Sequence, residues 1–246
     1  KMKIFKTVII FFILISWASA NTIYNLIKIP NLEIYSINSP TGIKYLKPYK
    51  AFQVGIRNNN VSCFDVKDGN IDKIFPLIDK NFKKYDETFL KKINLKYVVL
   101  CENLSVAGIG AAGVPNYLMK TLILDINFEK EYFERVLHHE IFHIINDNFK
   151  ELFEEKEWIN FNNKDFKYAE CSTCSDKLGL SLFEKTNGFL TEYSMTTPSE
   201  DMAEIYSFMM TDKKLLKNVI NKDSILENKV SYLKKKLMLI DENLKF

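Results

Sequence analysis

Between Glu129 and Asn148 the apolar residues recur every three or four positions, and this spacing predicts a helix with a largely buried face. The same run contains His139, Glu140 and His143 in an HExxH pattern. Residues four apart return to nearly the same face of a helix, so the two histidines project side by side. The pattern therefore predicts two neighbouring imidazoles on a mostly apolar helix.

Strands are predicted mainly in the first half of the chain. Alternating or β-rich residues indicate strands at 51–57, 96–101 and 121–126, and a glycine-rich loop at 107–113 separates the last two. A strand that comes shortly before the histidine helix is well placed to border a cleft there. If that strand is an edge strand, its free backbone groups can bind an extended peptide.

Helices are predicted in the remaining chain. Apolar residues at spacings of three and four indicate one helix of about five turns from Ile71 to Phe89, and a last helix at 224–240. The segment 151–158 is also expected to be helical, whereas 160–193 is expected to be irregular. Together, the predicted strands and helices lead us to expect an α+β fold, with a small mixed sheet over the histidine helix and a mostly helical C-terminal lobe.

The first twenty residues have the layout of a secretory signal peptide. Lysines at the start precede an apolar run at 8–15 and a small-residue site that ends at Ala20, after which cleavage is expected. An uncleaved anchor or a buried helix would be the alternatives. We therefore divide the chain into a signal peptide at 1–20, an extended segment at 21–50 and one domain at 51–246, and we expect a secreted, periplasmic or extracellular location.

Composition excludes several classes of partner. The chain is 47% hydrophobic, which is enough for a substantial core. Its formal net charge of +3 falls to about zero without the three lysines of residues 1–20, so no nucleic-acid surface is expected. No later stretch is long and apolar enough for stable membrane insertion after signal cleavage. The sequence carries no signal for an oligomeric state.

The chain has four cysteines, an even number, and all follow the predicted signal peptide. Export to an oxidising compartment favours disulfides. Cys63 with Cys101 and Cys171 with Cys174 is the simplest pairing, and the sequence leaves the other two connectivities open. A four-thiolate structural zinc site is the alternative.

The HExxH pattern has a chemical interpretation and a structural one. Two imidazoles at this spacing can share one zinc ion, and Glu140 can then reach a metal-bound water as a general base. In the structural interpretation, the histidines are core residues that hydrogen-bond to the backbone. Two histidines and a glutamate crowded on an apolar helix favour zinc, because an unpaired polar group is costly to bury.

Catalytic zinc generally takes three protein ligands and one water. The remaining histidine, His138, points about 100 degrees away from His139 around the helix. Asn146 and Phe149 occupy the glycine and third-histidine positions of the longer HExxHxxGxxH pattern. The third ligand should therefore be a carboxylate on another element.

Glu200 and Glu204 are the most distinctive carboxylates. They lie four apart on a helix that should begin at Thr197 and Pro198, with small residues on the same side that allow a close approach to the histidine helix. One of the glutamates can bind the metal while the other hydrogen-bonds a ligand histidine. Alternatively, Glu200 only caps the helix and Glu204 is solvated.

These residues together resemble the gluzincin metallopeptidases. The match is closest to the anthrax lethal factor-like catalytic domain and to related bacterial zinc-binding metallopeptidases, and it covers about residues 132–150 and 190–210. The resemblance implies a zincin-like fold. It also implies that Glu200 is the third zinc ligand, that Glu204 supports a histidine from the second shell, and that Tyr193 hydrogen-bonds the developing oxyanion.

We therefore expect a secreted zinc metallopeptidase that acts on a peptide or protein substrate. Its cofactor is Zn²⁺, held by His139, His143 and Glu200, and Glu140 acts as the general base. The alternative is a secreted binding module that keeps a zinc-peptidase fold without catalytic turnover.

Overall fold

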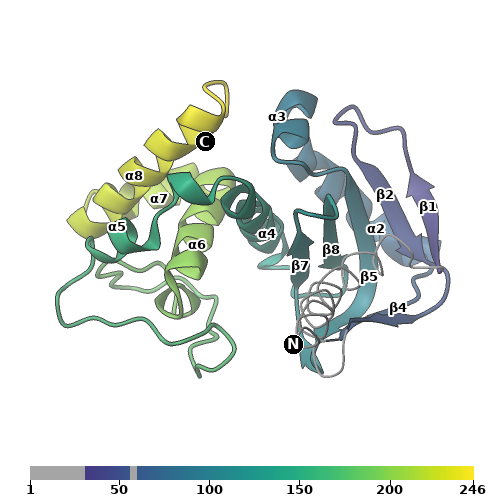
Figure 1. Cartoon of the computed structure of the whole chain (residues 1–246), viewed down its shortest axis with the longest axis horizontal. Coiled ribbons are helices and arrows are strands. Elements are labelled where there is room, and N and C mark those ends of the chain that lie inside the picture. The colour runs from purple at the N-terminus through teal and green to yellow at the C-terminus, as the bar shows by residue number, and fades with distance from the viewer. Residues whose placement is uncertain (1–30, 56–59) are drawn as a thin grey trace, which may run out of the picture.

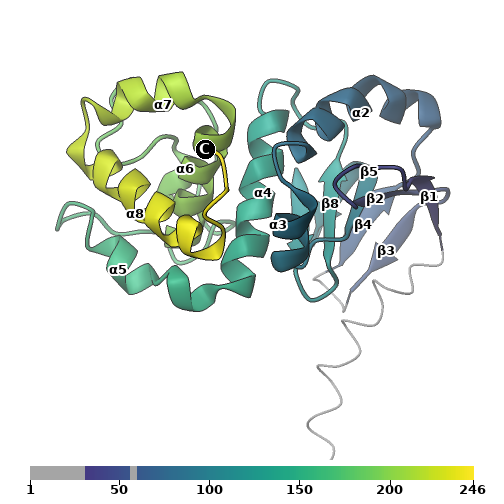
Figure 2. The same cartoon turned by 90° about the horizontal axis from the view of Figure 1, so that it is seen from above.

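The computed structural model describes residues 31–55 and 60–246. A lobe built on a β-sheet and a lobe built of helices lie on either side of helix α4 (Phe133–Asn148) (Figures 1 and 2). This arrangement confirms the predicted mixture of sheet and helix. The predicted signal peptide lies outside the described residues. Among the described helices, none has the length and apolar character to cross a bilayer.

The sheet is mixed and is built around the long strand β5 (Tyr97–Val106). Strands β2 (Lys44–Pro48) and β8 (Thr121–Asp125) run parallel to β5 on its two sides. Antiparallel strands follow at both edges, β1 (Leu32–Ser36) beside β2 and β7 (Gly113–Asn116) beside β8. The described part of the expected extended segment 21–50 is thus extended and contributes two strands to the sheet.

The second half of β5 curls away to pair with β4 (Val61–Phe64) and β6 (Ile109–Gly110), and β4 in turn pairs with β3 (Phe52–Val54). The Cys63–Cys101 disulfide joins β4 to β5, as the simplest pairing predicts. Both faces of the first half of β5 are buried because alternate residues between Val98 and Cys101 enter two separate apolar clusters.

The pattern between Ile71 and Phe89 forms two helices, so the prediction of one long helix is wrong. Helix α2 (Asp68–Phe82) accommodates Pro76 in its interior, and α3 (Glu87–Lys92) begins anew. The break occurs where the Asp86 side chain accepts a hydrogen bond from the backbone N–H of Phe89, 2.7 Å away. A side-chain cap of this kind starts a helix, and the apolar spacing alone does not reveal it.

The second lobe is helical, as predicted. It contains the short helix α5 (Glu155–Ile159), α6 (Pro198–Thr211), α7 (Lys213–Ile220) and α8 (Ser224–Ile240). Between α5 and the 3-10 turn η3 (Tyr193–Met195) the chain is irregular, and the Cys171–Cys174 disulfide lies in this stretch. A 3-10 turn η2 (Lys150–Leu152) connects α4 to this lobe.

Candidate metal centre

Helix α4 presents two imidazoles next to each other. The ring centroids of His139 and His143 are 4.8 Å apart, and their Nε2 atoms are separated by 3.1 Å. His139 is 6% exposed and His143 is half-buried. The four-residue spacing thus produces the pair of nitrogen donors that it predicts.

Glu200 reaches this pair from helix α6. Its Oε2 atom lies 2.9 Å from Nε2 of His139 and 3.1 Å from Nε2 of His143. One donor atom from each of the three residues lies within 4.8 Å of the other two, so the three side chains could hold one metal ion. Two imidazole nitrogens and one carboxylate oxygen form a donor set that suits zinc and leaves a fourth position open.

The start of α6 places Glu200 at this position. Thr197 caps the helix, and its Oγ1 accepts a hydrogen bond of 3.2 Å from the Glu200 backbone N–H. Ala203 and Ser207 are fully buried on the side of α6 that carries Glu200 and Glu204, and α6 packs closely against α4. Glu200 therefore supplies its N–H to the cap while its carboxylate faces the histidines.

Glu204 supports His139 from the other side of the ring. Oε1 of Glu204 lies 2.9 Å from Nδ1 of His139, and Oε2 accepts a 2.9 Å hydrogen bond from the Thr191 hydroxyl. A carboxylate only accepts hydrogen bonds, so Nδ1 carries the proton. In a neutral imidazole this leaves the Nε2 lone pair for a metal.

The carboxylates and imidazoles of this cluster shift one another's pKa values. Burial opposes a charge on His139, but Glu200 and Glu204 raise its pKa well above the usual range. Burial also opposes a charge on Glu200 and would raise its pKa, but His143 and His139 hold this pKa well below its usual value. The pocket therefore stabilises a cation next to the Glu200 carboxylate.

Glu140 occupies the space between α4 and the edge strand β7. A Cβ atom added to Gly113 of β7 would lie 2.5 Å from the Cγ atom of Glu140, so only glycine fits opposite this side chain. Burial raises the pKa of Glu140, although His139 and His143 lower it in part. A carboxyl group with a raised pKa is suited to take up a proton and release it.

Tyr193 lies beside the imidazoles in the 3-10 turn η3. Its ring centroid is 5.8 Å from that of His139, and its backbone N–H donates to the Gly179 carbonyl over 3.0 Å. Burial and the nearby carboxylates of Glu200 and Glu140 raise its pKa, so its hydroxyl keeps the proton. Every site residue named from the sequence is thus part of one cluster.

His138 is turned away from this cluster. It is fully buried, and its ring lies 2.6 Å from the Tyr85 hydroxyl and 2.9 Å from the side-chain oxygen of Asn81. This contact with α2 and its C-terminal extension satisfies the imidazole, in agreement with the direction expected from helix geometry.

Sequence reasoning missed three residues of the surroundings. The glycine-rich sequence predicts a loop at Gly113, whereas this residue begins the strand that covers Glu140. Thr191 carries no local signal because its partner is thirteen residues away. Arg135 contacts Glu204 and could have been noticed, because it precedes His139 by four residues.

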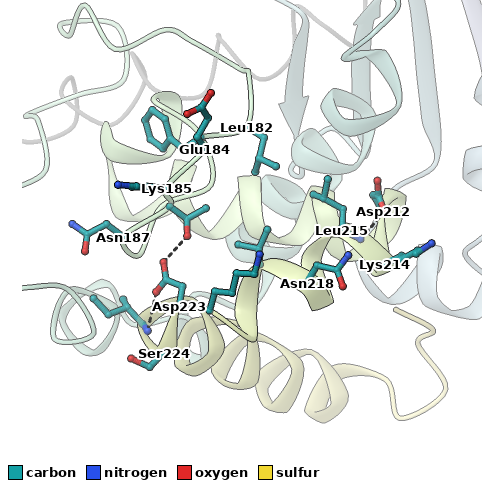
Figure 3. Close-up of a pocket in the computed structure, with 15 residues that line it drawn as sticks. Leu182, Glu184, Lys185, Asn187, Asp212, Lys214, Leu215, Asn218, Asp223 and Ser224 are labelled. Carbon is teal, nitrogen blue, oxygen red and sulfur yellow. Dashed lines mark hydrogen bonds between the residues drawn. The ribbon is translucent and has the colours of Figure 1, made fainter.

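A cavity of about 770 Å³ lies elsewhere, between residues 182–187 and the helices α7 and α8 (Figure 3). Asp223 at its wall accepts a 2.6 Å hydrogen bond from the Thr186 hydroxyl. None of the predicted site residues lines this cavity. Its size therefore does not make it the candidate site, since the convergent donor set lies at α4 and α6.

The fold and the donor set define a metalloprotein of mixed α and β structure, in which two histidines of one helix and a glutamate of another can share an ion. The model of the family described as "Putative zinc-binding metallo-peptidase" matches residues 105–245, and the chain belongs to this family. Zinc is therefore its metal.

A search of solved structures gives a crystal structure described as a putative zinc-binding metallo-peptidase from Bacteroides caccae ATCC 43185. The identity is 19% and the TM-score 0.47, and the match covers 92% of this chain and 85% of that one. Among curated proteins, no match was found.

Proposed function

We propose that the protein is a secreted zinc-dependent peptidase whose ion is held by His139, His143 and Glu200. The observation that carries this proposal is the convergence of these three donors beside Glu140. The family assignment supports zinc and a peptide or protein substrate. The zincin-like fold and the gluzincin-type ligand set belong to this proposal as well.

The roles of the chain's own residues follow from their surroundings. Zinc, when bound, would polarise the scissile carbonyl group and acidify a water molecule. The carboxylate of Glu140 accepts a proton from the water that attacks the scissile carbonyl carbon. It then donates this proton to the leaving amine nitrogen as the peptide bond breaks. The raised pKa of Glu140 allows it to hold this proton between the two steps.

Tyr193 and Glu204 complete the proposed machinery. The Tyr193 hydroxyl retains its proton and donates a hydrogen bond to the oxyanion that develops on the carbonyl oxygen. Glu204 keeps the His139 ring in place through Nδ1. Each residue thus has a separate role.

We propose that the substrate binds as an extended strand beside β7. Within the described sheet, β7 pairs with β8 alone, which leaves its second edge available for backbone hydrogen bonds. Gly113 of β7 packs against Glu140, so a peptide along this edge passes the general base. The sequence pattern pointed to strand 121–126 for this role, but β8 is paired on both sides.

A secreted location fits the two disulfides of the structure. We propose that the chain is cleaved after Ala20, and that residues 51–246 form the peptidase domain together with strands β1 and β2 of the segment 21–50. Cys171 and Cys174 pair with each other, so all four cysteines are oxidised and none is left for a thiolate zinc site.

Peptide hydrolysis tests the proposal against a non-catalytic binding module. The purified protein should cleave members of a peptide library, detected by mass spectrometry. Activity should disappear with a zinc chelator and return when zinc is added. Glu140→Gln should keep zinc and lose at least about a thousandfold in kcat, whereas Glu200→Gln should lose both zinc and activity. Zinc binding without any cleavage would favour the binding module.

A further inference from the structure

Arg135 lies one helical turn before His139 on the same face of α4. Its guanidinium is held between two aromatic rings, with its carbon 5.1 Å from the centroid of Tyr132 and 4.4 Å from that of Phe208. One of its amino groups, Nη2, donates to the Leu180 carbonyl over 2.5 Å. The side chain is therefore fixed by packing as well as by a hydrogen bond.

The other amino group faces Glu204. Nη1 of Arg135 is buried, has no hydrogen-bond partner in the described part of the chain, and lies 3.7 Å from Oε2 of Glu204. Glu204 is only 3% exposed. An ionised carboxylate is costly to bury without a nearby cation. Arg135 supplies this cation at the oxygen that does not face His139.

Two side chains of helix α6, Glu204 and Phe208, contact Arg135. Phe208 follows Glu204 by one turn, so the carboxylate and the ring stand next to each other on one face of α6. The guanidinium contacts both. Because His143 and His139 follow on the same face of α4, Arg135 connects the metal-binding faces of the two helices.

We propose that Arg135 is a positioning residue of the zinc site, which holds Glu204 in the orientation that supports His139. This inference rests on the proposed function only in that His139 is a zinc ligand. Arg135 fixes Oε2, the Thr191 hydroxyl bonds the same oxygen, and Oε1 is thereby left facing Nδ1 of His139. The imidazole then keeps Nε2 turned towards the metal.

Zinc affinity in competition with a chelator tests this role, because it does not depend on finding a peptide substrate. Arg135→Met keeps an apolar stem between the two rings but removes the charge. We expect it to bind zinc about tenfold more weakly, at the lower end of what the loss of a supporting residue costs. Arg135→Lys should recover part of the affinity, and the visible spectrum of the cobalt-substituted protein should shift in Arg135→Met.

Phe208→Leu is the matched control, because it removes one of the two ring contacts of Arg135 but keeps the charge, the contact with Tyr132 and the hydrogen bond to the Leu180 carbonyl. It should lower the melting temperature and leave zinc affinity unchanged. If Arg135→Met does not fold, Arg135→Gln takes its place, since its amide can still donate to the Leu180 carbonyl. Wild-type zinc affinity and an unchanged cobalt spectrum in the folded variant would overturn the proposal.

A double-mutant cycle with Glu204→Gln shows whether Arg135 acts through Glu204. If it does, Arg135→Met should cost little further affinity once Glu204 has lost its charge. Equal losses in both backgrounds would refute the inference. A wild-type protein that binds zinc at these residues but cleaves no peptide would contradict the proposed function alone. Undiminished zinc binding by His139→Ala would contradict the zinc site itself.

Discussion

The residues at the proposed centre have different roles, so their substitutions should affect kcat, KM and zinc content differently. Tyr193→Phe removes only the hydroxyl that is proposed to donate to the oxyanion. Because the pKa of this hydroxyl is raised, it is protonated across the neutral range and available as a donor. We expect kcat to fall roughly ten- to a thousandfold while KM and zinc content stay near wild type. Steady-state kinetics and metal analysis measure both, and a proportional rise in KM would place Tyr193 in substrate binding instead.

Gly113→Ala should disturb the general base without touching a proposed ligand. The added methyl group would meet Glu140 Cγ at 2.5 Å, so either the carboxylate or β7 must shift. We expect kcat to fall about a hundredfold, because small displacements of reacting groups are costly, while zinc content is kept. Gly110→Ala is the control, since a Cβ there meets nothing within 4 Å. Equal activity in both variants would show that the observed position of the Glu140 carboxylate against β7 is not required for catalysis.

What the sequence reveals at this scale depends on how local the geometry is. His139 and His143 share a face because they belong to one helix, so their spacing predicts their contact. The proposed role of Glu200 as a ligand rests on the resemblance to a family as well as on its place four residues before Glu204. Gly113 contacts Glu140 across two elements, which no spacing in the sequence encodes, whereas the spacing of Arg135 to His139 shows a shared helix face but not the contact with Glu204.

The junctions between elements depend on side-chain caps, and Asp223 shows this best. Its carboxylate caps α8 by accepting from the Ile225 and Leu226 N–H groups. It also accepts from the Gly188 N–H and from the Thr186 hydroxyl, and Figure 3 shows the bond to Thr186. Burial would raise its pKa, but these donors lower it below the ordinary value of 3.8. The ionised group therefore stabilises the fold above pH 3.8, and this contribution is lost as the pH falls through the lower folded pKa.

Asp223→Asn should consequently be less stable at neutral pH and less sensitive to acid. The amide cannot accept from all four donors, so we expect a loss of about 1–3 kcal/mol at pH 7. The gap to wild type should shrink between pH 5 and pH 3, as measured by denaturant unfolding. Asp212→Asn is the control, because Asp212 caps α7 through one bond to Leu215. A gap that stays constant with pH would refute the charged-cap account.

Element boundaries were predictable only where the apolar spacing and the capping residues agree. Helix α8 matches the predicted range 224–240, because its apolar stripe and its cap agree. The break between α2 and α3 was missed because the apolar spacing continues across it. Strand β7 was missed because its glycine and proline are typical of loops, and only its pairing with β8 makes it a strand.

At the scale of the whole molecule, the sequence predicted the α+β architecture, because most strands were expected in the first half of the chain and mostly helices in the second. The predicted disulfides have the simplest pairing, and the first of them follows from β4 lying beside β5. The sequence could not reveal how the two lobes meet. That arrangement depends on α4, whose residues pack into the sheet lobe on one side and against α6 on the other.

Because the proposed ligands come from α4 and α6, the ion would act as a crosslink between those two helices. Removal of the ion should therefore weaken the contact between the helices as well as abolish the chemistry. A ligand that binds only the folded state stabilises it by about 2.7 kcal/mol at a hundredfold excess over its Kd. We expect chelation to lower the melting temperature and to expose the α4–α6 contact to hydrogen exchange before β5 and β8. Simultaneous exchange of both regions would show that the helices stay joined without the metal. Packing alone would then hold the two lobes together, and zinc could bind and dissociate without destabilising the fold.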